Sequence, residues 1–372
     1  MLVASVSLRN FRSYEGAAAL LGGGLTVLWG PNGAGKTNLL EAVYFGCTGR
    51  SCRTASDREL VRFGQRTTRV VVAARDRDGE HELAVGFTPG EPKRTTVDGV
   101  AVERLLDAAA RPLVSVFLPE RLELVRGVPA LRRAHLDQLV AALWPARALT
   151  RRTYAQVLGQ RNALLARLRA GTASRASLDA WDRRLAETGI ALMADRRRAL
   201  GCIAEPFTEI CGQLRLDGDP DVAYVPRSHA SSATELAGEL RERLAGDIDR
   251  GFTDHGPHRD DVVLRRGGRP LRSYGSQGQQ RLALLALLLA ERRVIARERG
   301  RAPLMLLDDV MSELDADRRA ALSAILTQDG GQVLITTTEI EHVPGAFAPG
   351  VVRLSVRDGR LNDDVIPDLA AL

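Results

Sequence analysis

Residues 30–37 place three glycines, a lysine and a threonine at the spacing that phosphate binding requires. The segment reads GPNGAGKT and matches the pattern G-x-x-x-x-G-K-[ST] without a gap. Its glycines let backbone N–H groups turn inward around a phosphate. Lys36 can reach the β- and γ-phosphates of a nucleotide, and the Thr37 hydroxyl can bind Mg²⁺.

The residues on both sides of this loop suit that chemistry. An apolar run at 25–29 predicts a strand before it, and residues 38–45 predict a helix whose N-terminus adds its dipole to an anion site. The alternative is a glycine-rich turn without a ligand, but the strand-loop-helix context favours nucleotide binding. The predicted nucleotide-binding residues here are Gly30, Pro31, Asn32, Gly33, Ala34, Gly35, Lys36, Thr37 and Asn38.

Lysine is rare in this chain. Of 52 basic residues only Lys36 and Lys93 are lysines. A lysine at the one position where a phosphate loop uses a compact, flexible ammonium is therefore unlikely to be accidental. Lys93, in a predicted hairpin, weakens that argument.

Two neighbouring acids could supply the metal-binding carboxylate and the general base that a phosphate loop does not itself contain. Asp308 and Asp309 follow the apolar residues 304–307, which predict a buried strand. Asp308 can hold Mg²⁺ directly or through water, and Asp309 can act as the general base that polarises the attacking water. The alternative is a pair of surface acids at a strand end. With the phosphate loop upstream, we favour the catalytic role.

A second helix start also suits a phosphate. Ser276 lies 32 residues before Asp308, in the segment 273–281 that precedes a long apolar helix. Because the chain already has one phosphate loop, this second helix start suits the γ-phosphate held by another copy of the chain. A simple helix cap at Ser276 is the alternative.

The order of these motifs resembles ATP-binding-cassette proteins. Their signature begins Leu-Ser-Gly-Gly-Gln, and residues 275–279 keep Ser276, Gly278 and Gln279, while residues 312–315 end in Asp315 just after the paired acids. The chain departs from the cassette pattern in three places. Residues 336–339 read TTTE where a switch histidine is usual, Asp309 replaces a glutamate, and Pro119 and Glu120 stand where a linker glutamine is expected.

Further segments resemble the RecF family of bacterial recombination mediators. They are residues 8–14, 117–122, 132–137, 256–261, 277–281 and 307–315. The resemblance implies a slow, DNA-stimulated ATPase that uses ATP and Mg²⁺ and dimerises when ATP binds, with each Ser276 closing on the partner copy's nucleotide. It implies double-stranded and gapped DNA, RecO and RecR as partners, and a role in loading RecA. By position, Lys36, Asp308, Asp309 and Ser276 would be catalytic, Thr37 and Asp308 would bind the metal, and Arg12, Asn32, Ser276, Gly278, Gln279 and Asp315 would lie near the nucleotide.

The fold class expected from these patterns is α/β. It is an ABC-type ATPase head, with a mixed sheet carrying the phosphate loop and an antiparallel β subdomain, interrupted by an inserted α-helical lobe. Alternating strands and helices after residue 261 favour one mostly parallel sheet made from both ends of the chain. We place the head at 1–125 and 251–372 and the lobe at 126–250. Predicted strands are 2–8, 25–29, 69–74, 81–87, 94–97, 112–117, 261–265, 304–307 and 332–336, and predicted helices are 38–45, 130–144, 146–169, 177–212, 279–297 and 315–326.

The first half of the lobe is strongly basic. Residues 132–198 contain 14 arginines against five acids. These arginines are either a solvated helical face or a surface that contacts duplex phosphates. The DNA-contact candidates are Arg132, Arg133, Arg151 and Arg152.

Other classes of function fit less well. A transporter's nucleotide-binding subunit is the main alternative, but such subunits carry a full signature, a switch histidine and a shorter insertion. A coiled-coil chromosome organiser needs far more than about 120 inserted residues, and a scaffold with an inactive site would not need Lys36 and the paired acids. We expect no membrane partner and a cytoplasmic location. For His258 two roles stay open, a cap of a turn and a sensor of the nucleotide.

Overall fold

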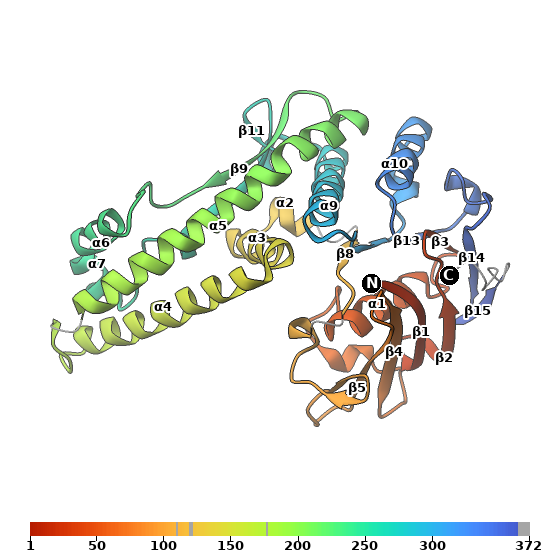
Figure 1. Ribbon diagram of the computed structural model, residues 1–372, viewed down its shortest axis with the longest axis horizontal. Helices are drawn as coiled ribbons and strands as arrows, with labels where there is room; N and C mark the ends of the chain where they lie inside the picture. The colour runs from red at the N-terminus through yellow and green to blue at the C-terminus, as the bar shows by residue number, and fades with distance from the viewer. Residues whose placement is uncertain (109–110, 119–121, 176–177, 364–372) are drawn as a thin grey trace. The chain divides into compact units, whose positions relative to one another are not determined.

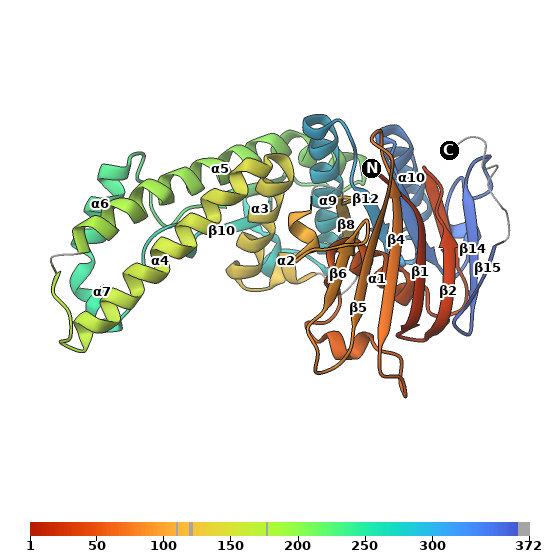
Figure 2. The same ribbon diagram turned by 60° about the horizontal axis from the view of Figure 1, so that its bottom comes forward.

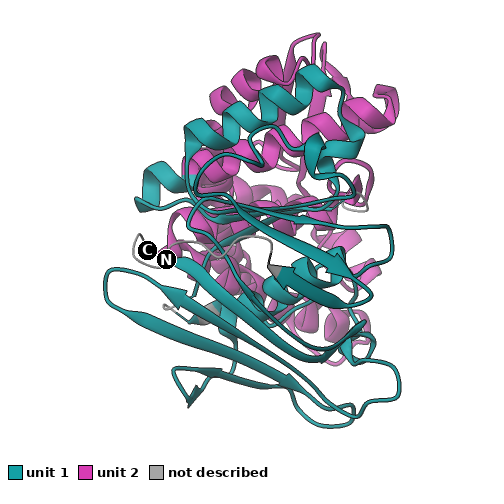
Figure 3. Ribbon diagram, turned by 90° about the vertical axis from the view of Figure 1, so that its right-hand side faces the viewer, with its two compact units in different colours: residues 1–121, 295–372 teal, residues 122–294 magenta. Residues whose placement is uncertain are grey.

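The computed structural model describes residues 1–108, 111–118, 122–175 and 178–363 (Figure 1). The chain divides into two compact units, coloured separately in Figure 3. Unit 1 comprises residues 1–121 and 295–372, and unit 2 comprises residues 122–294. Each unit is described by itself.

A six-stranded mixed sheet forms the centre of unit 1. Its order is β15-β14-β3-β13-β12-β8, and every neighbouring pair is parallel except β14 with β15. The prediction of one mostly parallel sheet from both ends of the chain is confirmed, because β3 and β8 come from the N-terminal part and the other four from the C-terminal part. The strands are β3 (Leu25–Trp29), β8 (Val114–Phe117), β12 (Leu304–Leu307), β13 (Val333–Thr337), β14 (Val352–Arg357) and β15 (Arg360–Asp363).

A second, antiparallel sheet completes the β structure of unit 1, as expected for the β subdomain. Its order is β2-β1-β4-β5-β6-β7. Asp98 and Gly99, both with positive φ, form the two-residue turn between β6 and β7, the geometry that favours this dipeptide in hairpins. The strands are β1 (Leu2–Phe11), β2 (Tyr14–Leu20), β4 (Thr68–Arg75), β5 (Glu80–Phe87), β6 (Arg94–Val97) and β7 (Val100–Ala101).

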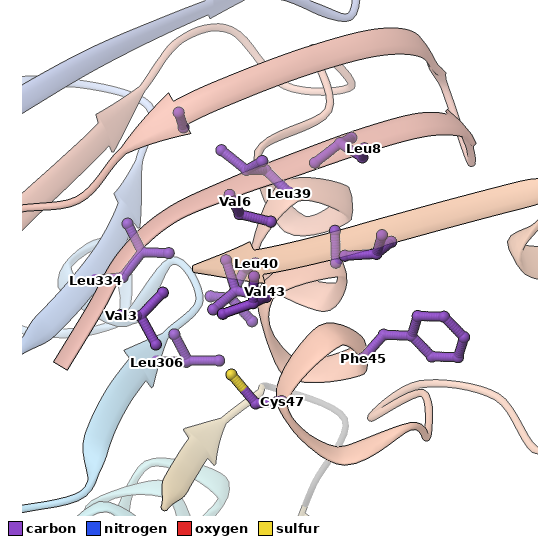
Figure 4. Packing of buried hydrophobic residues seen from close by; sticks show 14 of the residues in the cluster. Val3, Val6, Leu8, Leu39, Leu40, Val43, Phe45, Cys47, Leu306 and Leu334 are labelled. Carbon is purple, nitrogen blue, oxygen red and sulfur yellow. The ribbon is translucent and has the colours of Figure 1, made fainter. Parts of the chain in front are cut away.

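Helix α1 (Lys36–Thr48) is buried among strands of both sheets. Figure 4 shows Leu39, Leu40 and Val43 of this helix beside Val6 of β1 and Leu334 of β13. Because both sheets cover it, α1 is apolar on nearly all sides. This packing fixes the start of α1, which directly follows the phosphate loop. Unit 1 also contains α10 (Ala316–Asp329) and the short 3-10 helices η1 (Asp57–Leu60), η2 (Leu105–Asp107), η7 (Val310–Glu313) and η8 (Ile340–His342).

Unit 2 is mainly helical, and α4 and α5 run side by side as its longest pair (Figure 2). A small sheet, β11-β10-β9, lies within the same unit. Its helices are α2 (Glu123–Arg126), α3 (Pro129–Leu143), α4 (Ala148–Arg169), α5 (Leu178–Gln213), α6 (Ala233–Glu242), α7 (Leu244–Arg250), α8 (Leu271–Tyr274) and α9 (Gln277–Arg299), and its shorter elements are η4 (Pro145–Arg147), η6 (Pro257–Arg259), β9 (Pro220–Val225), β10 (Asp261–Arg266) and β11 (Arg269–Pro270). Helix α9 continues for five residues into unit 1.

The long helices match their predictions closely, and so do several short strands, whereas other elements were missed. Strands 94–97 and 304–307 have the predicted bounds, and α3, α4 and α5 lie within two residues of theirs where the structure describes them; Ser177, the predicted start of α5, is outside the described residues. Among the elements that were not predicted are β2, β9, α6, α7, β14 and β15.

Residues 251–294 belong to unit 2, although the predicted lobe ends at residue 250. They do so because β10 pairs with β9 and α3 packs on β10. The three-part functional division at 125 and 250 stays a prediction.

Candidate functional site

The phosphate loop connects β3 to α1, and all three of its glycines have a positive φ, 79° at Gly33. At Gly30 and Gly35 a side chain would also meet neighbouring atoms. Gly30 has φ 152°, and a Cβ there would lie 2.3 Å from the carbonyl oxygen of Val356. Gly35 has φ 115°, and a Cβ there would lie 3.0 Å from the Tyr14 hydroxyl. The loop therefore keeps its shape only with glycine at both positions. Between them Pro31, Asn32 and Gly33 are exposed, whereas Ala34 is buried.

Lys36 is held inside this loop. Its side chain is only 7% exposed, and its ammonium donates to the carbonyl oxygens of Gly30 at 2.8 Å and Pro31 at 3.0 Å. Burial lowers the pKa of Lys36, and the nearby carboxylates of Asp309 and Asp308 oppose that shift. The ammonium is thus kept within reach of the loop and of both acids.

Thr37 and Asp308 meet although they are 271 residues apart in the chain. The Thr37 hydroxyl lies 2.9 Å from each carboxylate oxygen of Asp308. Parallel pairing of β12 and β13, and of β13 and β3, brings the carboxyl end of β12 and the start of α1 to the same edge of the sheet. A hydroxyl and a carboxylate in contact are oxygen ligands of the kind that Mg²⁺ prefers.

Asp309 sits in a strained turn at the end of β12. Its φ is 44°, in the left-handed region, and its N–H donates to the Thr336 hydroxyl at 2.9 Å. The buried Oδ1 of its carboxylate accepts no hydrogen bond from any residue that the structure describes. This atom is available to a group that the protein itself does not supply.

Thr336 was not predicted as a site residue. It is fully buried in β13, and its hydroxyl donates to Asp308 Oδ1 at 2.7 Å. The sequence carried a signal, because residues 336–339 occupy the place of the usual switch histidine, but a departure from the motif was all that could be inferred.

The turn between β1 and β2 packs on the start of α1. Arg12 donates to both carboxylate oxygens of Glu41 at 2.9 Å, Asn38 donates to the Ser13 hydroxyl at 2.9 Å, and the Tyr14 hydroxyl donates to the Gly35 carbonyl at 3.0 Å. These contacts bring Arg12 and Asn38 beside the loop, and their role toward a nucleotide stays a prediction. Glu41, fully buried, was missed; its signal was a lone acid on an otherwise apolar stretch of helix.

Ser276 and Gln279 form a reciprocal cap at the start of α9. The Ser276 N–H donates to Gln279 Oε1 at 2.9 Å, and the Gln279 N–H lies 3.2 Å from the Ser276 hydroxyl. Ser276 and Gly278 are exposed, and buried Gln280 donates to the carbonyls of Leu271 and Gly275. These residues belong to unit 2, whereas the phosphate loop belongs to unit 1. Their role toward a nucleotide stays a prediction.

Asp315 caps the start of α10. Its carboxylate accepts the Arg318 N–H at 2.9 Å and pairs with the Arg318 guanidinium at 3.0 Å. Its side chain is 57% exposed. Its predicted role near the nucleotide is untested, and Pro119 and Glu120 lie outside the described residues.

Two of the four predicted DNA-contact arginines, Arg132 and Arg133, are largely withdrawn from solvent and bound to acidic residues or backbone inside unit 2. Arg132 is 5% exposed and holds Asp261 through contacts of 2.7 and 2.9 Å, and half-buried Arg133 donates to the Asp260 carbonyl at 2.7 Å. A phosphate would have to break the bidentate pair to reach Arg132, so that prediction is corrected: this arginine ties α3 to β10. Arg151 and Arg152 are exposed on α4, and Arg151 also pairs with Asp137 at 3.1 Å.

His258 is part of the interior of unit 2. Its Nε2 lies 3.0 Å from the Thr253 carbonyl and therefore carries the proton, while Nδ1 accepts from the Tyr154 hydroxyl at 2.7 Å. Burial lowers the pKa of His258 to about 4. A neutral histidine bonded at both nitrogens is explained by packing.

Metal clusters and membrane spans are both absent from the described part of the chain. Among the described residues no three histidine, cysteine, aspartate or glutamate side chains cluster as metal ligands. No helix within the described ranges is long and apolar enough to cross a membrane.

Comparisons with known proteins agree with this geometry. A family model described as an AAA domain matches residues 5–97. DNA replication and repair protein RecF of Myxococcus xanthus is 37% identical over 372 residues and covers 97% of each chain. The protein of the same name from Heliobacterium modesticaldum is 39% identical over 359 residues and 94% of each chain.

Solved structures extend the comparison. One described as the recombination mediator protein RecF with ATP in the RecFOR pathway has a TM-score of 0.85, 27% identity and 98% coverage of each chain. An SMC head bound to the C-terminal winged helix domain of ScpA, at TM-score 0.59 and 16% identity, shares the fold. The ABC/SMC-like ATPase fold is thus confirmed, and the chain belongs to the RecF family of DNA replication and repair proteins.

Proposed function

We propose that this protein is an ATP-dependent, DNA-binding recombination mediator whose ATP-bound form is a dimer and whose slow hydrolysis of ATP releases it. The contact that carries the proposal is the one between Thr37 and Asp308, at 2.9 Å, because it joins a phosphate loop to the acid that such a loop requires. The ATP in the solved RecF structure supports ATP as the nucleotide.

Binding falls to the loop and to Lys36. An ammonium has three N–H donors, and the carbonyls of Gly30 and Pro31 take two of them. The third is available for a phosphate oxygen. Thr37 and Asp308 would hold Mg²⁺, and their oxygen donors fit this ion. When bound, Mg²⁺ neutralises charge on the phosphate oxygens.

Hydrolysis needs a group that accepts a proton from water. Asp309 has a buried oxygen without a partner in the described protein, which supports its role as the general base. Aspartate has a shorter side chain than the usual glutamate and reaches less far toward a water molecule. We therefore propose a low turnover that DNA stimulates, suited to a switch.

The second copy of the chain would supply Ser276. This residue is exposed at the start of the long helix α9, where N–H groups and the helix dipole favour an anion. We propose that it meets the γ-phosphate bound by the partner copy, so that ATP joins the two copies.

The partners follow from the family. The solved relative's place in the RecFOR pathway supports RecO and RecR as partners and the loading of RecA on gapped duplex DNA as the outcome. A protein that acts on bacterial chromosomal DNA works in the cytoplasm. The transporter alternative gains no support from any contact described above.

Light scattering with and without ATP and gapped duplex tests dimerisation and DNA dependence together. The wild-type protein is expected to double its mass with ATP and to bind the duplex more tightly. Lys36→Ala is expected to stay monomeric because it loses phosphate binding. Lys93→Ala is the matched control, since it removes the only other lysine, which pairs with Asp57 at 2.7 Å. Dimers of Lys36→Ala at saturating ATP would contradict the proposal.

A further inference from the structure

Thr336 lies near the end of β13, between the two acids of the candidate site. It is fully buried, and its position is where cassette ATPases usually carry a switch histidine. Nothing in the motif pattern assigns a function to a threonine there.

The hydroxyl of Thr336 uses both of its hydrogen-bonding functions on those acids. It donates to Asp308 Oδ1 at 2.7 Å and accepts the Asp309 N–H at 2.9 Å. Asp308 in turn accepts from Thr37. One chain of hydrogen bonds therefore runs from the phosphate loop through Asp308 and Thr336 to the backbone of Asp309.

The contact with Thr336 is made where Asp309 has an unusual backbone conformation. Strand β12 ends at Leu307, and the φ of 44° at Asp309 is unfavourable for a residue with a side chain. The Thr336 hydroxyl accepts the N–H of Asp309 itself, and the surrounding contacts must stabilise the strained backbone. The Asp309 carboxylate is left with a buried oxygen that no described residue engages.

We propose that Thr336 is the positioning residue of this ATPase. Its hydroxyl orients the Asp308 carboxylate toward Thr37 and fixes the turn that presents Asp309. It thus links the metal-binding acid to the general base from one strand, in the place of a switch histidine. The inference rests on the proposed function, because it assumes that Asp308 and Asp309 serve ATP.

Thr337 provides a matched control in the same strand. It is also fully buried, but its hydroxyl donates to the Glu339 carbonyl at 2.9 Å and to neither acid. Successive residues of a strand point to opposite faces, which explains the difference. Valine at either position removes only the hydroxyl and nearly preserves the shape.

The experiment compares Thr336→Val, Thr336→Ser and Thr337→Val with the wild type in three measurements. They are the melting temperature without ligand, the affinity for a fluorescent ATP analogue in EDTA and over a Mg²⁺ titration, and kcat and KM for ATP. Thr336→Val is expected to lower kcat about tenfold or more, since it loses a hydrogen bond to a charged group. It should also require more Mg²⁺ for half-maximal nucleotide binding, with unchanged affinity in EDTA. Thr336→Ser should recover most of the kcat and most of the wild-type Mg²⁺ dependence. Thr337→Val should match the wild type in these two properties.

Several results would overturn the assignment. Thr336→Val with wild-type kcat and Mg²⁺ dependence would do so, and so would equal losses in Thr336→Val and Thr337→Val. If Thr336→Val does not fold, Thr336→Ala replaces it and the same results decide. A wild-type protein that neither binds nor hydrolyses ATP would instead contradict the proposed function, so the two failures are distinguishable.

Discussion

The side chains with the clearest chemistry are Lys36, Thr37, Asp308 and Asp309. Residue type and spacing predicted all four, because a phosphate loop and a strand ending in acids are local patterns. The contacts among them could not be predicted with the same certainty, since they depend on the sheet order. Thr336 shows the limit: a threonine in a strand has no distinctive pattern, and only the register of β13 beside β12 brings its hydroxyl to Asp308.

The role of Arg132 was misjudged because the sequence does not show that this side chain is buried. An arginine in a basic helix suits both solvent and phosphate, and the sequence alone does not identify its partner. Asp261, 129 residues further along, is the partner of Arg132. Long-range ion pairs of this kind leave no local trace in the sequence.

His258 makes the stability of the protein depend on pH. Its pKa in the folded state is about 4, below the ordinary value of 6.5, so the unfolded chain binds the proton more readily. The stabilising effect of neutral His258 is therefore fully present above about pH 6.5 and is lost as the pH falls toward 4, by up to about 1.4 kcal/mol per pH unit. We expect the denaturant midpoint to fall across this window, and His258→Gln to reduce the fall.

The exposed His229 of the same unit is the control for that measurement. His229→Gln should follow the wild-type pH curve. A curve for His258→Gln that parallels the wild type would show that other groups cause the pH dependence.

At the scale of elements, long periodic segments were predictable, whereas some shorter segments without a clear local pattern were not. α3, α4, α5 and α9 each have an apolar periodicity over many residues. β14 and β15 are short strands that gain their stability from pairing with β3 and with each other, which the sequence does not encode locally. For the same reason β9 became visible only through its partner β10.

Helix α4 carries the remaining DNA-contact candidates. Arg151→Gln with Arg152→Gln is expected to weaken binding to gapped duplex and to reduce the dependence of log K on log salt by about 0.9 for each DNA phosphate that the variant no longer neutralises. Fluorescence anisotropy across a salt series measures both. Arg241→Gln with Arg243→Gln removes the same charge from two exposed positions outside the basic residues 132–198 and should leave the slope unchanged.

Arg132→Gln separates the two roles of arginine in this unit. Breaking its buried pair with Asp261 is expected to destabilise the protein by about 3 kcal/mol, without a specific change in the salt dependence of DNA binding.

An unchanged salt dependence of DNA binding in the Arg151 and Arg152 variant would mean that these residues form a solvated face.

The start of α9 gives a test of the shared site. Ser276→Arg is expected to leave ATP binding by the monomer intact and to block the ATP-dependent dimer, because a bulky cation replaces the hydroxyl proposed to face the partner's phosphate. Equilibrium binding of a fluorescent ATP analogue and light scattering measure the two effects.

Ser232→Arg controls for the loss of a helix cap. Ser232 caps α6 by accepting the Glu235 N–H at 3.2 Å, and such a cap contributes about 1 kcal/mol. This variant should still dimerise. Loss of ATP binding by monomeric Ser276→Arg would mean that Ser276 acts on the nucleotide of its own chain.

The whole molecule is built so that one unit interrupts the other. The α/β class and the use of both chain ends in one sheet followed from the motif order, since a phosphate loop near residue 36 needs an acid that appears only at 308. The C-terminal boundary of unit 2, at residue 294, did not follow from the motif order. Residues 251–294 read as the return of strands and helices, yet they pair with β9 and pack on α3 in unit 2.

The order of strands around β3 has a consequence for folding during synthesis on the ribosome. Both neighbours of β3, which are β13 and β14, are made roughly 300 residues after it. At ordinary translation speeds of 5–20 residues per second, that delay is about 15–60 s. During this time residues 122–294, an uninterrupted segment, can fold while β3 has no partner strand. A nascent chain can therefore fold its inserted unit before β3 has either neighbour, and a chain that ends before β13 lacks both strands that pair with β3.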